Sequence, residues 1–151
     1  MKKEKVPLLL AAIEYLKTEP SRFDMADGIA GIRVWRNGSL LEEPPCGTAC
    51  CYAGSVAIVS GRIELSNSLH TRQCTSYNWW DVRKSAVEAL ELTEDEAESL
   101  FLLKHQAASG MSQRHWPEPF DTEYMLAKTS AERVWALERR VQHFIAMEVE
   151  A

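Results

Sequence analysis

The chain has 151 residues, of which 46% are hydrophobic and 26% charged, and its formal net charge is -5. This length suits one globular domain that buries roughly 68–70% of the surface its unfolded form exposes, so we expect a single helical domain over residues 1–151 and exclude a disordered or fibrous chain. The acidic balance argues against general binding to nucleic acid, because the phosphates of nucleic acid attract basic proteins.

The N-terminal segment predicts an amphipathic helix. Pro7 suits the first turn of a helix, and Leu9, Ile13 and Leu16 recur at helical spacing on one face. Charged residues interrupt the apolar run, which argues against a secretory leader, and no apolar run has the length of a membrane span. We therefore expect a cytoplasmic protein without membrane association. Its four cysteines are then free thiols or metal ligands rather than disulfides.

Residues 18–45 are rich in Pro, Gly, Asn, Asp and Ser, and their clearest turn signal is Asn37-Gly38. Residues 32–36 alternate apolar and charged side chains, and they can pair across this turn with Leu40 and Leu41. The sequence thus leaves room for one small β-hairpin beside the helices.

The stretch 44–54 is the most unusual in the chain, because it holds three of the four cysteines. Two prolines disfavour a helix before Cys46, and the small residues after Thr48 permit one. We therefore place Cys46 to Thr48 at the N-terminus of a helix that runs to about Ser60 and ends before Gly61. The free N–H groups and the positive dipole of a helix N-terminus favour a thiolate or a bound anion.

The C-terminal half predicts further helices. After a polar loop at 62–77, we expect a helix over 80–90 and another from the capping box of Thr93 and Glu96 to Leu103. A second loop with Gly and Pro follows.

Two helices close the chain, a short one over 121–128 and the longest one, capped at Thr129 or Ser130, with Glu132 placed to complete a capping box. The apolar stripe of the last helix is Val134, Leu137, Val141, Phe144 and Ile145, and the charged residues outside it are Arg133, Glu138, Arg139 and Arg140. The sequence as a whole predicts a mainly α, compact single-domain bundle of five or six helices.

Four short segments together carry a resemblance to a known family. They are Phe23-Asp24-Met25, Cys46-Gly47-Thr48-Ala49-Cys50 with Ala53-Gly54, the helix start from Leu92 to Phe101, and Trp116-Pro117. With these segments the chain resembles a family of small bacterial and phage proteins of uncharacterised function that share the motif Cys-Gly-Thr-x-x-Cys-x-Ala-Gly. We take Cys46 and Cys50 as its two cysteines. The resemblance implies a common fold and gives no activity.

The cysteines allow a metal site. Cys46 and Cys50 are four residues apart and can lie on one face of a helix, and His70 and Cys74 repeat this spacing in the following loop. Four soft ligands are the number that tetrahedral zinc needs. A zinc site is therefore one hypothesis, although the usual Cys-x2-Cys knuckle is not among these ligands; otherwise we expect no cofactor.

Two other interpretations of the cysteines stay open. A cysteine at a helix N-terminus can act as a nucleophile with His70 or His115 as its base. No complete catalytic constellation accompanies it, so we lean towards a protein that is not an enzyme. The third interpretation, which we favour, is that the cysteines are small apolar residues that let one helix pack closely, with Thr48 as its cap.

These observations favour a small interaction protein of bacterial or phage origin, regulatory or inhibitory, that acts by binding another protein. The alternative is a metal-binding or thiol-active domain centred on Cys46 and Cys50. Trp79 and Trp80 are candidate interface residues, but a core position is the more common one for such aromatics. His143 lies in a helical pattern beside apolar residues, and we expect it at the edge of the core or on the surface.

Overall fold

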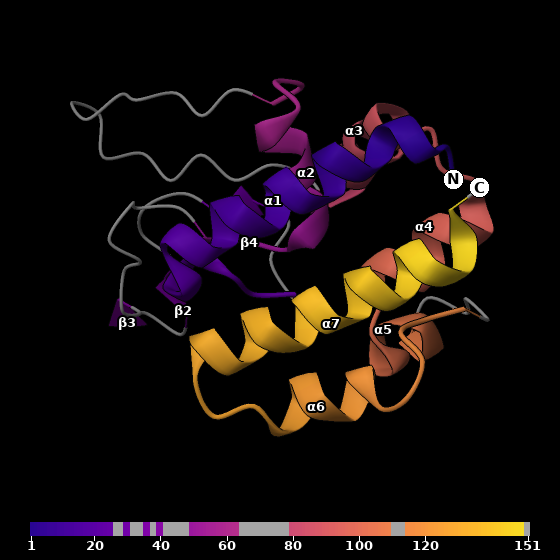
Figure 1. Cartoon of the computed structure of the whole chain (residues 1–151). Coiled ribbons are helices and arrows are strands. Elements are labelled where there is room, and N and C mark those ends of the chain that lie inside the picture. The colour runs from indigo at the N-terminus through magenta and orange to yellow at the C-terminus, as the bar shows by residue number, and fades with distance from the viewer. Residues whose placement is uncertain are drawn as a thin grey trace.

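The computed structural model describes a mainly α-helical protein (Figure 1). It describes the backbone of residues 1–25, 29–30, 35–36, 39–40, 49–63, 79–109 and 114–149, and the side chains of residues 1–25, 51–63, 81–107 and 114–149. The α-helices in these residues are α1 (Val6–Thr18), α2 (Tyr52–Val59), α3 (Trp79–Leu90), α4 (Glu94–Phe101), α5 (Lys104–Ser109), α6 (Phe120–Leu126) and α7 (Ser130–Glu148). Two 3-10 helices, η1 (Lys3–Lys5) and η2 (Pro20–Arg22), flank α1.

The mainly α fold is confirmed, with seven α-helices in the described residues where five or six were expected. The additional helix is α5, for which the sequence predicted no separate helix. Two side chains support the start of α5: Asp121 accepts a hydrogen bond from the Lys104 amide at 2.8 Å, and Gln106 accepts one from the Leu103 amide at 2.9 Å. Asp121 is distant in sequence, so this support could not be predicted from the local pattern.

Four two-residue strands accompany the helices in the described part of the chain. Strand β1 (Ile29–Ala30) pairs antiparallel with β4 (Ala49–Cys50), and β2 (Trp35–Arg36) pairs antiparallel with β3 (Ser39–Leu40). The second pair lies within the segment where the sequence left room for a hairpin, with Trp35 opposite Leu40.

The core lies between α1, α2, α3 and α7. Helix α1 packs against both α2 and α7, α2 packs against α3, and α6 packs against α7 (Figure 1). The predicted stripe of α1 is buried, as are Val134, Leu137, Val141 and Phe144 of α7. Burial of these apolar side chains stabilises the fold by roughly 1.5–3 kcal/mol for each large one. Among the helices in the described residues, none is long and apolar enough to cross a membrane.

The capping residues of the C-terminal helices confirm most of the sequence prediction. Thr93 caps α4: its hydroxyl accepts from the Glu96 amide at 3.2 Å and its own amide donates to the Glu96 carboxylate at 2.8 Å, a complete capping box. Thr129 caps α7 in the same way, accepting from the Glu132 amide at 3.2 Å. The Glu132 carboxylate, however, accepts from the amide of Lys128, so the second box is not closed as expected.

The start of α2 corrects the sequence prediction. The helix begins at Tyr52 and not at Thr48, because Ala49 and Cys50 form β4 and pair with β1. This pairing uses backbone hydrogen-bonding groups that a helix would have needed. The helix therefore does not begin at Thr48, and Cys46, Gly47 and Thr48 themselves lie outside the described residues. The predicted end is confirmed, since Gly61 has a φ of 76°, which favours glycine after a helix.

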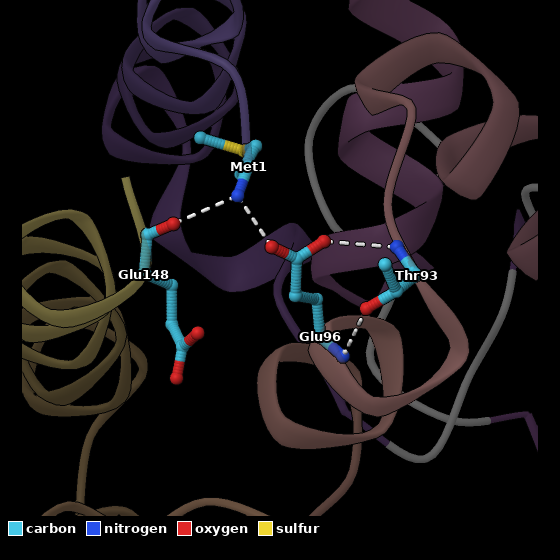
Figure 2. Close-up of polar contacts among 4 residues, drawn as sticks. All are labelled: Met1, Thr93, Glu96 and Glu148. Atoms are coloured by element: carbon cyan, nitrogen blue, oxygen red, sulfur yellow. Dashed lines mark hydrogen bonds and ion pairs between the residues drawn. The ribbon is translucent and has the colours of Figure 1, made fainter. Parts of the chain in front are cut away.

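The first residue of the chain connects three elements (Figure 2). The Met1 ammonium donates a hydrogen bond to the Glu148 carbonyl at the end of α7 at 2.7 Å, and it forms an ion pair with the Glu96 carboxylate at the start of α4. The other carboxylate oxygen of Glu96 accepts from the Thr93 amide. Glu96 thus joins the start of α4 to the N-terminal segment and, through Met1, to the end of α7.

Candidate functional site

The structure brings together only part of the predicted cysteine site. Cys46, Gly47, Thr48, His70 and Cys74 lie outside the described residues, and Cys50 is described by its backbone alone, in β4. Cys50 lies in a strand and not in the helix that the sequence predicted for it. In the part of the chain that the structure describes, no group of three metal-ligating side chains occurs. The zinc hypothesis therefore stays a prediction.

Cys51, which the sequence predicted to be one of the small apolar packing residues, caps α2. Its sulfur accepts a hydrogen bond from the Gly54 amide at 3.4 Å, and its side chain is buried. Counted from Cys46, the second cysteine of the Cys-Gly-Thr-x-x-Cys-x-Ala-Gly motif is also Cys51 and not Cys50. The motif counting and the capping geometry thus give Cys51 a structural role as the N-cap, the role that the sequence had assigned to Thr48.

Two of the remaining motif residues meet on one core side chain, Tyr124 of α6. Phe23 and Trp116 each contact the Tyr124 ring edge to face, with centroids 5.7 and 5.8 Å apart. The Tyr124 hydroxyl accepts from the Met25 amide at 3.0 Å, and burial raises its pKa. Asp24, between Phe23 and Met25, is half-buried. Phe23 and Trp116 therefore pack the core, which supports a structural role for the motifs.

A cleft between α4, α7 and the segment before α6 is a candidate binding site. It has a volume of about 330 Å³. Its lining residues are Ser99, Arg114, His115, Pro117, Arg140, His143, Met147 and Glu148. Two arginines and two histidines in one cleft give it an excess of hydrogen-bond donors, although the chain as a whole is acidic.

Arg140 is the central side chain of the cleft and corrects the sequence prediction, which placed it on the outer face of α7. It is only 2% exposed. One of its terminal nitrogens donates to both the carbonyl and the hydroxyl oxygen of Ser99, each at 2.8 Å. Its Nε has no hydrogen-bond partner. Burial lowers the pKa of Arg140 to about 10, against an opposing effect of Glu148, because a charged guanidinium is poorly solvated there.

The hydrogen bonds of the two histidines determine which ring nitrogen carries the hydrogen. His115 Nδ1 lies 2.7 Å from the Trp116 carbonyl, and because a carbonyl only accepts, this nitrogen donates. His143 Nδ1 lies 3.2 Å from an Arg140 nitrogen, and because a guanidinium only donates, this nitrogen accepts. The other nitrogen of His143, Nε2, must then carry the hydrogen. His143 is thus a further donor in the cleft.

A second feature is an apolar surface at the turn between α6 and α7. Leu126 is 72% exposed, and Met125 and Trp135 are each 55% exposed. We call these three residues the turn face. The guanidinium of Arg139 lies over the Trp135 ring, 4.9 Å from its centroid, and forms an ion pair with Glu123 of α6.

Comparison with known proteins shows no relative: no family model, no curated protein and no solved structure matches the chain. The resemblance to the bacterial and phage family therefore stays a prediction. The cleft and the turn face are the features from which a function can be argued.

Proposed function

We propose that this protein acts by binding another protein and that the turn face is its contact surface. The observation that supports the proposal is the exposure of Leu126 and Trp135, which lie on either side of the turn between α6 and α7. Large apolar side chains that remain exposed next to each other lose water when a partner covers them. Tryptophan and arginine are also the side chains that most often dominate the energy of an interface.

The pairing of α6 with α7 supports the view that these residues form one surface. The two helices run antiparallel (Figure 1). Phe120 lies against His143, with ring centroids 5.0 Å apart, and one turn further along Glu123 pairs with Arg139. One more turn on each helix brings Leu126 level with Trp135. The exposed side chains therefore lie together at one end of the helix pair.

Arg139 holds Trp135 in place for binding. Its guanidinium lies over the ring of Trp135 and is 5.5 Å from the ring centroid of Phe120, and its ion pair with Glu123 fixes its position. A side chain held in the free protein loses less conformational entropy on binding than a mobile one. The same arrangement places charged groups beside the apolar residues, as the polar rim of an interface requires.

The test is affinity capture with matched variants. We expect the Leu126→Ser, Trp135→Ser double variant to lose a partner that the unchanged protein captures reproducibly, since truncating an interface tryptophan costs about 2 kcal/mol or more. The control is Leu10→Ser, because Leu10 is also an exposed apolar residue, at 43%, but lies on α1. A partner that the double variant still captures, or that the control loses equally, would contradict the proposal.

A further inference from the structure

We infer that the cleft around Arg140 binds the phosphate group of a small organic molecule. The site is separate from the turn face and does not depend on the proposed function. Arg140 forms its floor, because this residue is almost completely buried and yet lines the cleft. Arg114, with a side chain 56% exposed, lies at its rim.

The hydrogen bonding of Arg140 is incomplete among the described residues. A guanidinium has five N–H donors. Two of them bond to Ser99 and one bonds to His143. The Nε donor has no partner, and one hydrogen on Nη1 is also left over. These two donors lie on different edges of the guanidinium and do not form one bidentate pair, so the remaining Nη1 hydrogen is the one that can donate singly to an oxygen of a bound anion.

The positive charge of buried Arg140 also favours an anionic ligand. Among the described residues, Arg83 pairs with Glu94 and Arg139 pairs with Glu123, whereas Arg140 forms no ion pair with a carboxylate. A buried charge without a counterion costs stability. Glu148, which also lines the cleft, compensates the charge of Arg140 only in part, and a bound anion would add to this compensation.

Several cationic and hydrogen-bond-donating residues line the same cleft. Arg114 pairs with Asp95 only at 3.5 Å, and both side chains are more than half exposed, so a stronger anionic partner can replace this contact. The Nε2 hydrogen of His143 adds another donor. Together with Arg140 these groups suit the three terminal oxygens of a phosphate monoester better than the two oxygens of a carboxylate.

The size and the apolar lining of the cleft indicate that the phosphate belongs to an organic molecule. The volume of about 330 Å³ lies in the range of small-molecule sites. Pro117 and Met147 lie beside the polar residues and can contact a ring or a short carbon chain. Glu148 also lines the cleft and weakens the attraction for an anion, which provides a useful variant for the test.

The experiment is isothermal titration calorimetry with phenyl phosphate, inorganic phosphate and benzoate. We expect phenyl phosphate to bind, inorganic phosphate to compete with it, and benzoate to bind about tenfold more weakly or less, because a carboxylate engages fewer donors. We expect Arg140→Gln and Arg114→Gln each to weaken the binding of phenyl phosphate by about fivefold or more, and Glu148→Gln to strengthen it by about twofold.

The matched control is Arg133→Gln, since Arg133 lies on the same helix but does not line the cleft. No binding of phenyl phosphate, equal binding of benzoate, or equal weakening by Arg133→Gln and Arg114→Gln would overturn the inference. If Arg140→Gln does not fold, the opposite effects of Arg114→Gln and Glu148→Gln decide the question. The turn-face variant should leave phosphate binding unchanged, so that failure of one proposal is distinguishable from failure of the other.

Discussion

At the scale of single residues, Arg140 shows how a charged side chain can belong to the interior. It follows Leu137 by three positions and precedes Phe144 by four, so all three lie on one face of α7. That spacing was visible in the sequence and indicated an inward position. The charge of Arg140 suggested the outer face of the helix instead. The Ser99 oxygen atoms that accept hydrogen bonds from Arg140, and so lower the cost of burying it, are distant in sequence.

Tyr52 gives a prediction at the same scale. Its ring is fully buried, its hydroxyl donates to the Leu9 carbonyl at 2.9 Å, and burial raises its pKa well above 10.0. In the unfolded chain the hydroxyl ionises near pH 10. The contribution of Tyr52 to stability is therefore fully present below this pH and is lost as the pH rises above it.

We expect Tyr52→Phe to lower the free energy of unfolding at neutral pH by about 1 kcal/mol, the usual value of one hydrogen bond. The same variant should lose less stability between neutral and alkaline pH than the unchanged protein. In the Tyr52→Phe variant, the free energy of unfolding still falls in part at alkaline pH, because the pKa of Tyr124 is also raised. Urea unfolding at a series of pH values measures both effects, and an unchanged alkaline slope would contradict the explanation.

At the scale of elements, the helices that have a local N-cap begin where the sequence predicted. Thr93 and Thr129 cap α4 and α7 at the predicted places, since the capping side chain and the amide that it accepts from are three residues apart. Helix α2 begins later than the sequence predicted. Strand β4, just before the helix, pairs with β1, which lies about twenty residues earlier, and this pairing determines where α2 starts. The cap therefore moved from Thr48 to Cys51.

The N-cap of α2 leads to a second prediction. We expect Cys51→Ala to lower the free energy of unfolding by about 1–2 kcal/mol, because the variant loses both the acceptor for the Gly54 amide and buried contacts of the sulfur. Cys51→Ser should cost less, since its hydroxyl can accept the same hydrogen bond. Thermal unfolding of both variants provides the measurement. Equal losses in the two would show that packing, and not capping, is the role of Cys51.

At the scale of the whole molecule, Glu96 joins segments that are far apart in the chain (Figure 2). Burial alone would raise its pKa, but the Met1 ammonium and the Thr93 amide outweigh this effect, and the pKa of Glu96 is lowered from 4.5. A lowered pKa means that the contribution of Glu96 is present above about pH 4.5 and is lost as the pH falls through the pKa of the folded state.

We expect Glu96→Gln to lower the free energy of unfolding by about 1–3 kcal/mol at neutral pH, as loss of a charge-assisted hydrogen bond does, and to reduce the loss of stability on acidification. A two-residue extension before Met1 should act through the same contact. The effects of the extension and of Glu96→Gln should then be less than additive. The control is Glu4→Gln, because Glu4 is exposed. Full additivity would show that the ion pair contributes nothing.

The sequence by itself determined the mainly α fold, the apolar stripes of α1 and α7 and the caps of α4 and α7, because these features depend on residues within one or two helical turns. The tertiary structure decided the start of α2, the burial of Arg140 and the existence of the cleft. Each of these depends on a contact between distant segments: β1 with β4, Arg140 with Ser99, and α7 with the residues before α6. The physical reason is that backbone and charged groups become buried only where a distant partner satisfies their hydrogen bonds.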